Sequence, residues 1–336
     1  MRTLSVVIPF FNTEAPYFER CISSLDCGRG AKLEVIVVDD GSDDDSSYEL
    51  NAITDGSGLD ISVYRKANGG QSSARRYGLE RARGEFVLFM DSDDYVDGVA
   101  FASLIDILED FDSDILCFNY DVVSPDGSVL NRNDVWVGGV LPIDLRQGIF
   151  CSDSLWRQVY RVQALRRSEV DFVQGVRIGE DLATAVSFLV AIGSASSVGL
   201  SVYRYVRRPT STLGAPPRSS MMDIVAAFDA MESMLGSRLK PYRYEVEWLS
   251  IVHILYWNGI RIIQECGPDA ELRGRLFGWM DERFPSWREN PYLSTEIMAR
   301  SLSFRLVVGG HWRTYYIQFR IKRMLKMSGN RFGSCL

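Results

Sequence analysis

Short apolar runs alternate with helical patterns over the first 120 residues of the chain. Five of these runs are rich in Val, Ile, Leu and Phe, as is typical of strands buried on both faces. They occupy residues 4–10, 33–38, 61–65, 85–90 and 114–120. Between them apolar residues recur at helical spacing, as in Phe18, Cys21, Ile22 and Leu25. Buried strands separated by helices predict an α/β fold with a doubly wound, mostly parallel sheet.

The pattern changes at the Pro-rich stretch GAPPRSS, which begins at Gly214. Beyond it the apolar spacing is helical, and prolines separate the predicted helices. These helices span residues 221–236, 242–265, 269–284 and 292–308. The sequence therefore predicts a domain at residues 1–214, with halves at 1–120 and 121–214, followed by a helical C-terminal extension at residues 215–336.

Charge is unevenly distributed along the chain. The formal net charge is −7, and residues 301–336 contain seven Lys or Arg and no acidic residue, so this tail carries +7 and the rest −14. The acidic body argues against a nucleic-acid partner. The tail predicts an amphipathic helix with Ile317 and Ile321 on one side. Such a helix suits an anionic membrane surface, and the alternative is that it docks onto the acidic body.

The sequence also suggests a cellular location. Its apolar runs stay shorter than the ~20 residues that a membrane-spanning helix needs, and the start MRTLSVVIPFFN has no signal-peptide core. The six cysteines form no CxxC pair and are expected to be buried free thiols. We therefore expect a cytoplasmic protein, which the tail would hold peripherally at the inner face of the plasma membrane.

Aromatic and acidic residues follow three of the predicted strands. Phe11 and Asn12 follow the first, Asp39 and Asp40 the second, and DSDD at residues 91–94 the fourth. Strands of a parallel sheet present such residues at one edge, where ligands bind. Clustered carboxylates repel one another unless a cation shares the site. Oxygen ligands without His or Cys favour Mn²⁺ or Mg²⁺ held jointly with a diphosphate. The alternative is a set of solvated turns with helix-capping Asp residues.

Four ordered motifs resemble the family 2 glycosyltransferases: SVVIPFFN, VIVVDDGSDD, NGGQSSARRYGLERARGEFVLFMDSDD and IGEDL. The resemblance covers about residues 4–214 and implies the GT-A fold, which binds nucleotide sugars. It implies that Phe11 stacks on the nucleotide base and that Asp40, with Asp39 beside it, bonds the uracil edge. Asp91 is then expected near the ribose. The alternative for Asp39 and Asp40 is a local role in turns.

The resemblance also assigns a metal site and a general base. Asp93 is expected on the cation, with Asp94 available to the cation or the acceptor. Asp181 resembles the general base, with Glu180 supporting it; the alternative is that both only complement a helix dipole. The other expected nucleotide-sugar-binding residues lie in or beside these motifs: Pro9, Asn12, Glu14, Lys66, Gly70, Ser73, Arg75 and Ser92.

Several side chains have two interpretations. Lys66, Arg75 and Arg76 flank a Gly turn and would either bind the diphosphate or face solvent. In SVYRYVRRPTST, Arg207 and Arg208 are further candidates for a diphosphate contact on closure of the site. Two aromatic residues in SLWRQVYRVQALRR would form a wall for a sugar ring or pack in the core: Trp156 and Tyr160.

The chain also departs from the family pattern. Phe11 stands where Tyr is common, Arg76 replaces the Asn of SARN, and Ala183 and Thr184 follow GED where a large aromatic residue is usual. The QxxRW motif is absent, which argues against a processive polysaccharide synthase.

The resemblance implies a metal-dependent, inverting glycosyltransferase. It would move a hexosyl or N-acetylhexosaminyl group from a UDP-sugar to a saccharide or lipid-linked saccharide during cell-surface polysaccharide or glycan assembly. One base and no covalent intermediate suit inversion. Two alternatives stay open. One is a non-catalytic nucleotide-sugar-binding scaffold. The other is a sugar-nucleotide pyrophosphorylase, whose expected Gly-rich GxGTR-like loop is missing from PFFNTE.

Overall fold

The computed structural model describes residues 3–208 and 217–329, with the backbone alone for residues 324–329. The chain divides into two compact units. The first comprises Met1–Gly175, Glu180–Gly214 and Ala230–Arg238, and the second comprises Val176–Gly179, Ala215–Asp229 and Leu239–Leu336. Most of residues 215–336 thus form a unit of their own, while residues 230–238 belong with the first. The roles given to residues 1–120 and 121–214 stay predictions.

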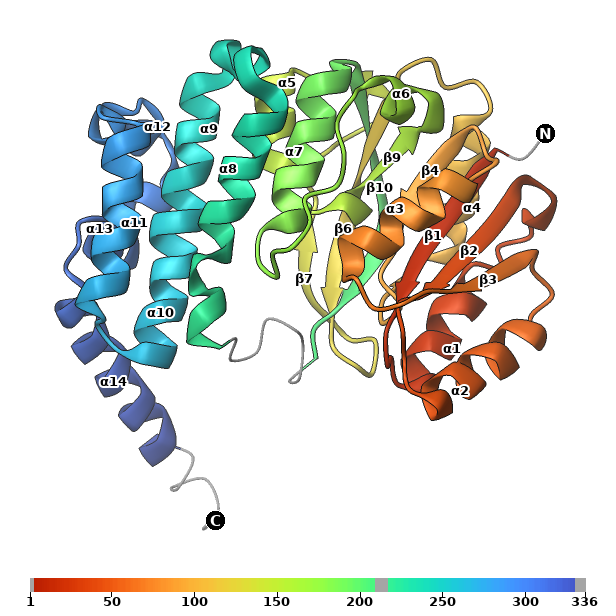
Figure 1. Ribbon diagram of the computed structural model, residues 1–336, viewed down its shortest axis with the longest axis horizontal. Coiled ribbons are helices and arrows are strands. Elements are labelled where there is room, and N and C mark those ends of the chain that lie inside the picture. The colour runs from red at the N-terminus through yellow and green to blue at the C-terminus, as the bar shows by residue number, and fades with distance from the viewer. Residues whose placement is uncertain (1–2, 209–216, 330–336) are drawn as a thin grey trace. The chain divides into compact units, whose positions relative to one another are not determined.

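The first unit contains a ten-stranded sheet with the order β3-β2-β1-β4-β9-β6-β10-β5, to which β7 adds beside β6 and β8 beside β10 (Figure 1). Parallel pairing joins β3, β2, β1 and β4, and also β6 and β10, whereas β9 is antiparallel to both β4 and β6. The strands are β1 (Leu4–Phe10), β2 (Leu33–Asp39), β3 (Ile61–Arg65), β4 (Phe86–Phe89), β5 (Tyr95–Val96), β6 (Ile115–Val123), β7 (Val129–Asn133), β8 (Leu141–Pro142), β9 (Gln158–Arg161) and β10 (Ala195–Val206).

The five predicted strands are β1, β2, β3, β4 and β6, so the α/β fold class is confirmed. Every residue of β1, β2 and β4 is buried, which agrees with their continuous apolar sequences. The antiparallel β9 was not predicted, because its sequence QVYR is too short and too polar to stand out.

Seven helices accompany the sheet in the described part of this unit: α1 (Ala15–Ser24), α2 (Asp44–Asp55), α3 (Gln71–Arg81), α4 (Gly98–Leu108), α5 (Leu145–Cys151), α6 (Val162–Arg167) and α7 (Glu180–Ile192). The small residues of α3 allow a close approach to β1. A Cβ atom at Gly78 would lie 2.3 Å from Cγ1 of Val7, so only glycine fits there. Helix α2 begins where the Asp43 carboxylate accepts a hydrogen bond from the Ser46 N–H at 2.8 Å.

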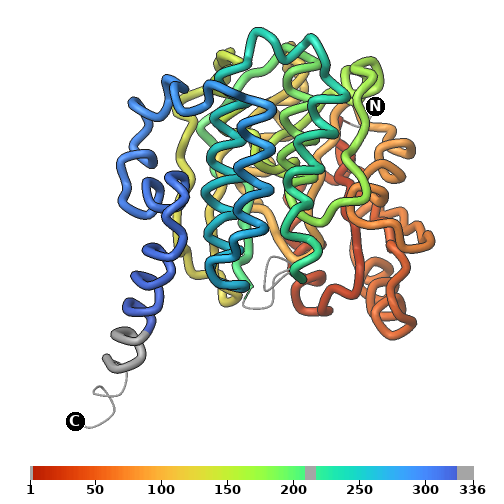
Figure 2. Tube along the Cα trace, turned by 60° about the vertical axis from the view of Figure 1, so that its left-hand side comes forward, coloured from red at the N-terminus to blue at the C-terminus, as the bar shows by residue number. Residues whose placement is uncertain are grey.

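The second unit is helical, and α8 (Asp223–Leu235) begins in it. The predicted helix at residues 242–265 is α9 (Arg243–Ser250), a π-helical stretch at Ile251–Trp257 and α10 (Asn258–Cys266); α11 is Ala270–Arg283. The predicted single helix at 292–308 is wrong. It is broken into α12 (Tyr292–Thr295), a 3-10 turn and α13 (Leu302–Val308), because Ser301 caps a new helix by accepting the Phe304 N–H. Figure 2 follows the chain from α13 into α14 (Trp312–Gly329).

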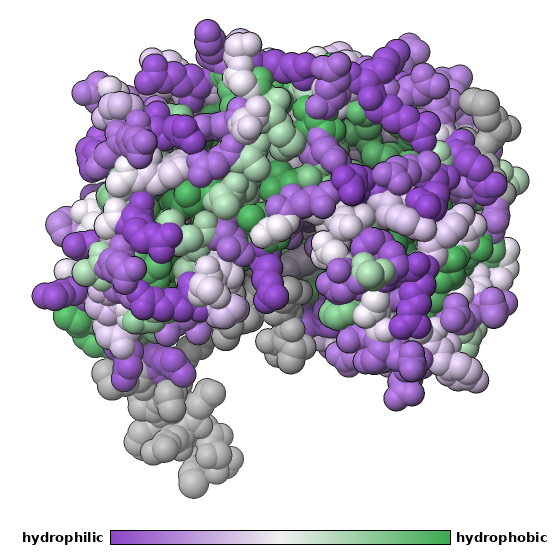
Figure 3. All heavy atoms as spheres, in the orientation of Figure 1, coloured by the Kyte–Doolittle hydropathy of each residue, from purple (hydrophilic) through white to green (hydrophobic). Residues whose placement is uncertain are grey.

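The surface and the cysteines agree in part with the sequence. Hydrophilic residues cover most of the face in Figure 3, with smaller apolar areas between them. The five cysteines in the described residues are free, as predicted, but only Cys21 and Cys117 are buried; Cys27 and Cys151 are partly buried and Cys266 is exposed. The sixth, Cys335, lies outside the described residues. Across residues 3–208 and 217–329, we find no helix that combines the length and apolar character needed to cross a membrane.

Candidate active site

The candidate site lies where β2, β1 and β4 end. These three strands are adjacent and parallel, with β1 in the middle. Phe10 at the end of β1 pairs with Asp39 of β2, and the Met90 N–H after β4 donates to the Val7 carbonyl at 3.0 Å. The loops that carry Phe11, Asp40 and the DSDD sequence therefore begin side by side, as the sequence predicts.

The loop after β1 offers one exposed aromatic ring. Phe11 is 52% exposed, whereas Pro9 is buried within β1. Asn12 has a φ of 47° and holds two loops together. Its N–H donates to Ser42 Oγ at 3.0 Å, and its side-chain oxygen accepts the Asp43 N–H at 2.9 Å. Phe11 is thus free to stack on a flat ligand, while Asn12 supports the loop beneath it.

The two carboxylates after β2 are both engaged by the protein. Asp39 accepts hydrogen bonds from the Ser42 N–H and from Ser47 Oγ, both at 2.8 Å, which shapes the turn into α2. Asp40 is 3% exposed and accepts the Lys66 ammonium at 2.5 Å and the Gly70 N–H at 2.7 Å. These contacts match the local role that the sequence left open. The hydrogen bond of Asp40 to a uracil edge stays a prediction.

The loop that Asp40 holds leads into α3. Gly70 stands just before the helix with a φ of 85°, a conformation that favours glycine. Ser73 in the first turn of the helix is partly buried, and Lys66 also donates to the Ala67 carbonyl at 2.7 Å. The backbone donors of Gly69 and Gly70 thus point at a carboxylate, which is the group an anionic ligand would have to replace.

Arg75 is the central cation of the site. Its side chain is 0% exposed, so the solvent-facing interpretation is wrong for this residue. One end of the guanidinium bonds Asp91 at 2.7 Å, and the other forms an ion pair with Asp181 at the start of α7. Gln71 donates to the same Asp91 oxygen at 2.7 Å. Arg75 therefore joins two predicted site carboxylates that lie far apart in the sequence. Arg76, by contrast, is exposed and pairs with Asp171 at 3.2 Å.

Burial perturbs the acidic groups around Arg75. Burial raises the pKa of Asp181 and of Asp91, while the charge of Arg75 opposes the increase at both. Burial, helped by the charge of Asp181, raises the pKa of Glu180 to about 7. A general base works best when its pKa lies near the working pH. Glu180 and Asp181 at the start of α7 therefore form a pair suited to proton transfer.

Asp94 and Tyr203 connect the DSDD loop to β10. Asp94 is buried, and its two oxygens accept the Tyr203 hydroxyl at 2.9 Å and the Val206 N–H at 2.7 Å. Burial raises the pKa of Asp94 well above its usual value, and the charges of Asp93 and Asp91 add to the increase. The Tyr203 hydroxyl also accepts the Asp91 N–H at 3.0 Å. Direct binding of a cation by Asp94 stays a prediction.

An aromatic stack supports this loop from below. The rings of Trp156 and Tyr203 stack with centroids 4.5 Å apart, and the rings of Trp156 and Tyr205 stack with centroids 5.7 Å apart. Both Trp156 and Tyr160 are buried, so core packing is the correct interpretation and neither forms a free wall for a sugar ring. Tyr203 was not predicted as a site residue, since its polar contacts are with a loop more than a hundred residues away in the sequence.

Asp93 is the most exposed of the three acids in the DSDD sequence. Its side chain is 24% exposed and forms an ion pair with Arg208. Glu14 lies on the same side, with an oxygen 3.8 Å from the Arg208 guanidinium. Ser92 shares a hydrogen bond of 2.6 Å with Thr13. Arg208 thus joins the site, as one of the two arginines that the sequence singled out there.

The residues around Asp93 supply only some of the oxygen ligands that a divalent ion needs. Among the described residues, no three His, Cys, Asp or Glu side chains are arranged to hold a metal. One partly exposed carboxylate and its neighbours do fit a cation whose other ligands are phosphate oxygens and water, because Mg²⁺ and Mn²⁺ accept such shared sites. The residues present are compatible with that arrangement.

The family model for glycosyl transferase family 2 matches residues 5–174, which is more than half of the chain. The chain belongs to glycosyl transferase family 2. This assignment confirms the resemblance in the four motifs. Two of the relatives of this family 2 member illustrate the degree of similarity. It is 29% identical over 225 residues to EpsJ, an uncharacterized glycosyltransferase of Bacillus subtilis, covering 65% of each chain. It is 28% identical to the Staphylococcus aureus poly(ribitol-phosphate) β-N-acetylglucosaminyltransferase TarS, covering 57% of this chain and 33% of TarS.

Solved structures support the fold of this family 2 member. TarS residues 1–349 with UDP-GlcNAc superpose with a TM-score of 0.71 at 19% identity, over 95% of this chain and 92% of that one. A mannosyltransferase of Pyrobaculum calidifontis with GDP-Man and Mn²⁺ gives a TM-score of 0.52 at 16% identity, over 96% and 88% of the two chains. The chain spans 65% of the length of EpsJ and 33% of the length of TarS.

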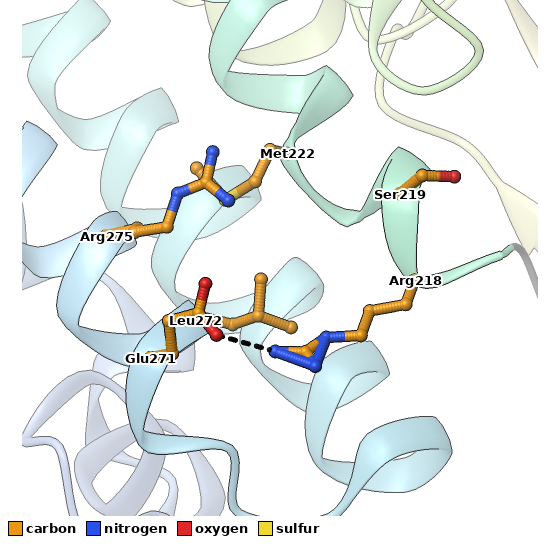
Figure 4. A pocket seen from close by; sticks show the side chains of 6 residues that line it. All are labelled: Arg218, Ser219, Met222, Glu271, Leu272 and Arg275. Carbon is orange, nitrogen blue, oxygen red and sulfur yellow. Dashed lines mark hydrogen bonds and ion pairs between the residues drawn. The ribbon is translucent and has the colours of Figure 1, made fainter.

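A separate cavity of about 390 Å³ lies in the second unit, between α11 and the 3-10 turn Arg218–Met222 (Figure 4). In Figure 4 the Arg218 side chain points at Glu271, with which it pairs at 3.1 Å. Arg218 also pairs with Asp269 at 2.8 Å. Because these carboxylates neutralise Arg218, and none of the lining residues belongs to the family motifs, we assign the cavity no role in the reaction.

Proposed function

We propose that this family 2 glycosyltransferase moves a sugar from a UDP-sugar to a saccharide acceptor with inversion at the anomeric carbon. The observation that carries the proposal is the buried bridge of Arg75 between Asp91 and Asp181. It joins the predicted donor residues at the end of β4 to the predicted base at the start of α7. The TarS complexes with UDP-GlcNAc and UDP support a uridine nucleotide as the donor.

The donor nucleotide would bind at the ends of β1 and β2. The exposed ring of Phe11 is suited to stack on the base, since base–aromatic stacking needs a free ring face. Asp40 lies beside it with its loop of backbone donors, and Asp91 is positioned for the ribose. The fully buried Arg75 fixes the carboxylate of Asp91, so its own role is to position and not to cover the diphosphate.

The acceptor hydroxyl would lose its proton to the pair at the start of α7. We propose Asp181 as the base that takes this proton at a carboxylate oxygen, with its other contact fixed by Arg75. Glu180, with its pKa near 7, would share or relay the proton. The acceptor oxygen would attack the anomeric carbon from the face opposite the diphosphate as the bond to the diphosphate breaks, and this single displacement would invert the anomeric carbon.

A divalent ion, Mn²⁺ or Mg²⁺, would bind at Asp93, with Asp94 next to it, and would neutralise the leaving diphosphate as a Lewis acid. The Mn²⁺ in the Pyrobaculum calidifontis complex supports such a site. The name of TarS supports an N-acetylhexosaminyl group as a candidate for the transferred sugar, with a hexosyl group as the other candidate. The acceptor that we propose is a saccharide or lipid-linked saccharide of the cell surface.

We also propose that α14 holds the enzyme at an anionic membrane surface on the cytoplasmic side. Ile317 is 59% and Ile321 48% exposed, and both project from the helix next to the exposed Arg313 and Arg320. An apolar strip flanked by basic side chains is typical of helices that lie in the lipid interface. Each basic residue near such a surface contributes at most about 1 kcal/mol.

Vesicle sedimentation tests this part of the proposal. The protein should pellet with anionic vesicles and not with neutral ones, and binding should weaken in salt. Replacing Ile317 and Ile321 together by Ser should abolish pelleting, whereas Ile297→Ser with Leu302→Ser, an exposed apolar pair outside α14, should preserve it. Failure of the wild type to pellet would favour a tail docked on the protein body.

A donor screen tests the reaction itself. Thermal unfolding should shift upward with one UDP-sugar in the presence of Mn²⁺, because a ligand of the folded state stabilises it. Donor hydrolysis should fall strongly in Asp93→Ala and Asp181→Asn but not in Asp110→Ala, whose side chain is exposed on the surface. Binding of a UDP-sugar with equal background hydrolysis in the wild type and Asp93→Ala would instead indicate a non-catalytic scaffold.

A further inference from the structure

Arg208 has an unusual position for a residue at the edge of a site. It follows β10 by two residues, and its side chain is only 16% exposed. Its guanidinium forms an ion pair with Asp93, lies 3.8 Å from a Glu14 oxygen and stands over the Tyr17 ring at 5.1 Å. Its Nε is buried without a hydrogen-bond partner among the described residues. The side chain is therefore held over Asp93 by charge and packing together.

The neighbouring arginine provides a contrast. Arg207 is exposed, and its backbone N–H continues the sheet by donating to the Val123 carbonyl at 2.8 Å. Among the described residues, its guanidinium has no ion pair. The two adjacent arginines thus differ in burial and in contact with the predicted metal ligand.

The DSDD sequence explains why Asp93 needs a cation. Asp91 is neutralised by Arg75, and Asp94 is satisfied by two uncharged donors, the Tyr203 hydroxyl and the Val206 N–H. Asp93 stands between them in the chain, and like charges this close disfavour one another. Of the three acids, Asp93 alone depends on a cation that lies at the mouth of the site, partly open to solvent.

We propose that Arg208 is a built-in cation that neutralises Asp93 in the free enzyme and competes with the divalent ion for its carboxylate. A guanidinium that occupies the carboxylate removes a ligand from the metal and places a positive charge beside it. The free enzyme should consequently bind the metal weakly. Arg208 must leave Asp93 for the metal to bind fully. This inference rests on the metal site of the proposed function.

Direct metal binding without nucleotide tests the competition. The free Mn²⁺ signal in electron paramagnetic resonance measures the Mn²⁺ affinity of the full-length protein, with no turnover involved. Arg208→Met removes the charge and adds no oxygen ligand, so it should tighten Mn²⁺ binding about tenfold, the effect of releasing an ion pair worth about 1.4 kcal/mol. Arg207→Met is the matched control and should change the affinity less than about twofold, because exposed charges are screened.

Further variants at position 208 and a measurement of Mn²⁺ binding with UDP present complete the test. Arg208→Lys keeps the charge as a compact ammonium and should leave the Mn²⁺ affinity close to that of the wild type. Arg208→Ala also removes the charge and adds no oxygen ligand, so it covers the case in which Arg208→Met fails to fold. Equal affinities in the wild type and Arg208→Met, or an equal gain in Arg207→Met, would overturn the inference. If the wild type bound no Mn²⁺ even with UDP present, the metal site of the proposed function would fail instead.

Discussion

Replacing Glu180 by Gln should make the protein more stable at neutral and alkaline pH. The folded structure holds the pKa of Glu180 at about 7, against 4.5 for an ordinary glutamate, chiefly through burial and then through the charge of Asp181. Between these two pH values the folded protein keeps a proton that the unfolded chain releases. Stability therefore falls as pH rises from 4.5 to 7. Gln does not titrate, so the variant escapes this loss.

The size of the effect follows from the two pKa values. Over the whole interval their difference corresponds to about 3 kcal/mol, at about 1.4 kcal/mol per pKa unit. The acidic pI of about 5.1 limits measurements near pH 5, where the net charge vanishes. Between pH 5.5 and 8 the gain of the variant over the wild type should grow by about 2 kcal/mol as an upper value, since Glu180 is only partly buried and solvent screens its charge.

Urea unfolding at several pH values between 5.5 and 8 measures this difference. Glu19→Gln, an exposed glutamate on α1, is the control and should give a constant difference from the wild type across the range. Subtracting the wild-type curve removes the titration of the acids that both proteins share. A difference for Glu180→Gln that stays flat with pH, or that shrinks as pH rises, would refute the assignment of a raised pKa to this residue.

Three further substitutions test other parts of the site. Arg75→Met should cost about 3 kcal/mol of unfolding free energy, because it leaves the partly buried carboxylates of Asp91 and Asp181 without their cation. The cost should shrink at low pH, where the two carboxylates protonate, and urea unfolding against pH measures both effects. Phe11→Ala should weaken UDP binding by about 1–3 kcal/mol in calorimetry and leave stability within about 0.5 kcal/mol, because the ring is exposed. Glu34→Gln should cost about 2–3 kcal/mol at neutral pH, since the Glu34 carboxylate accepts hydrogen bonds from Ser5, Arg83 and Gly84. Burial raises the pKa of Glu34, but the hydrogen bonds outweigh burial and the pKa lies below its usual value, so the stabilisation of the ionised form, and with it the cost of the substitution, should be lost in acid.

The sequence predicted the sheet well because the central strands are buried on both faces. Their continuous apolar runs leave one interpretation, and β1, β2 and β4 lie where those runs stand. The broken helix at residues 292–308 could not be predicted in the same way. Its apolar spacing continues across the break, and the capping hydrogen bond of Ser301 to the Phe304 N–H is one of many that a serine can make.

The sequence also located the acids of the site but not their partners. Asp93 and Asp181 were found because each belongs to a local motif. Their contacts with Arg208 and Arg75 connect residues 115 and 106 positions apart, and nothing in the spacing of a sequence specifies such pairs. Arg75 was expected on a diphosphate or in solvent, since an arginine in a helix is seldom fully buried. The fold overrides that expectation by placing a carboxylate on each side of it.

Three acids follow β4 without destabilising the fold because each is neutralised differently. Asp91 has a buried arginine, Asp93 has an arginine at the mouth of the site, and Asp94 has uncharged donors and a strongly raised pKa. Of the three carboxylates, only Asp93 can exchange its partner, Arg208, for another cation without unfolding the surroundings, since Arg75 is enclosed and the donors to Asp94 belong to β10. The loop is thus built so that one carboxylate is available for ligand chemistry while its two neighbours hold it in place.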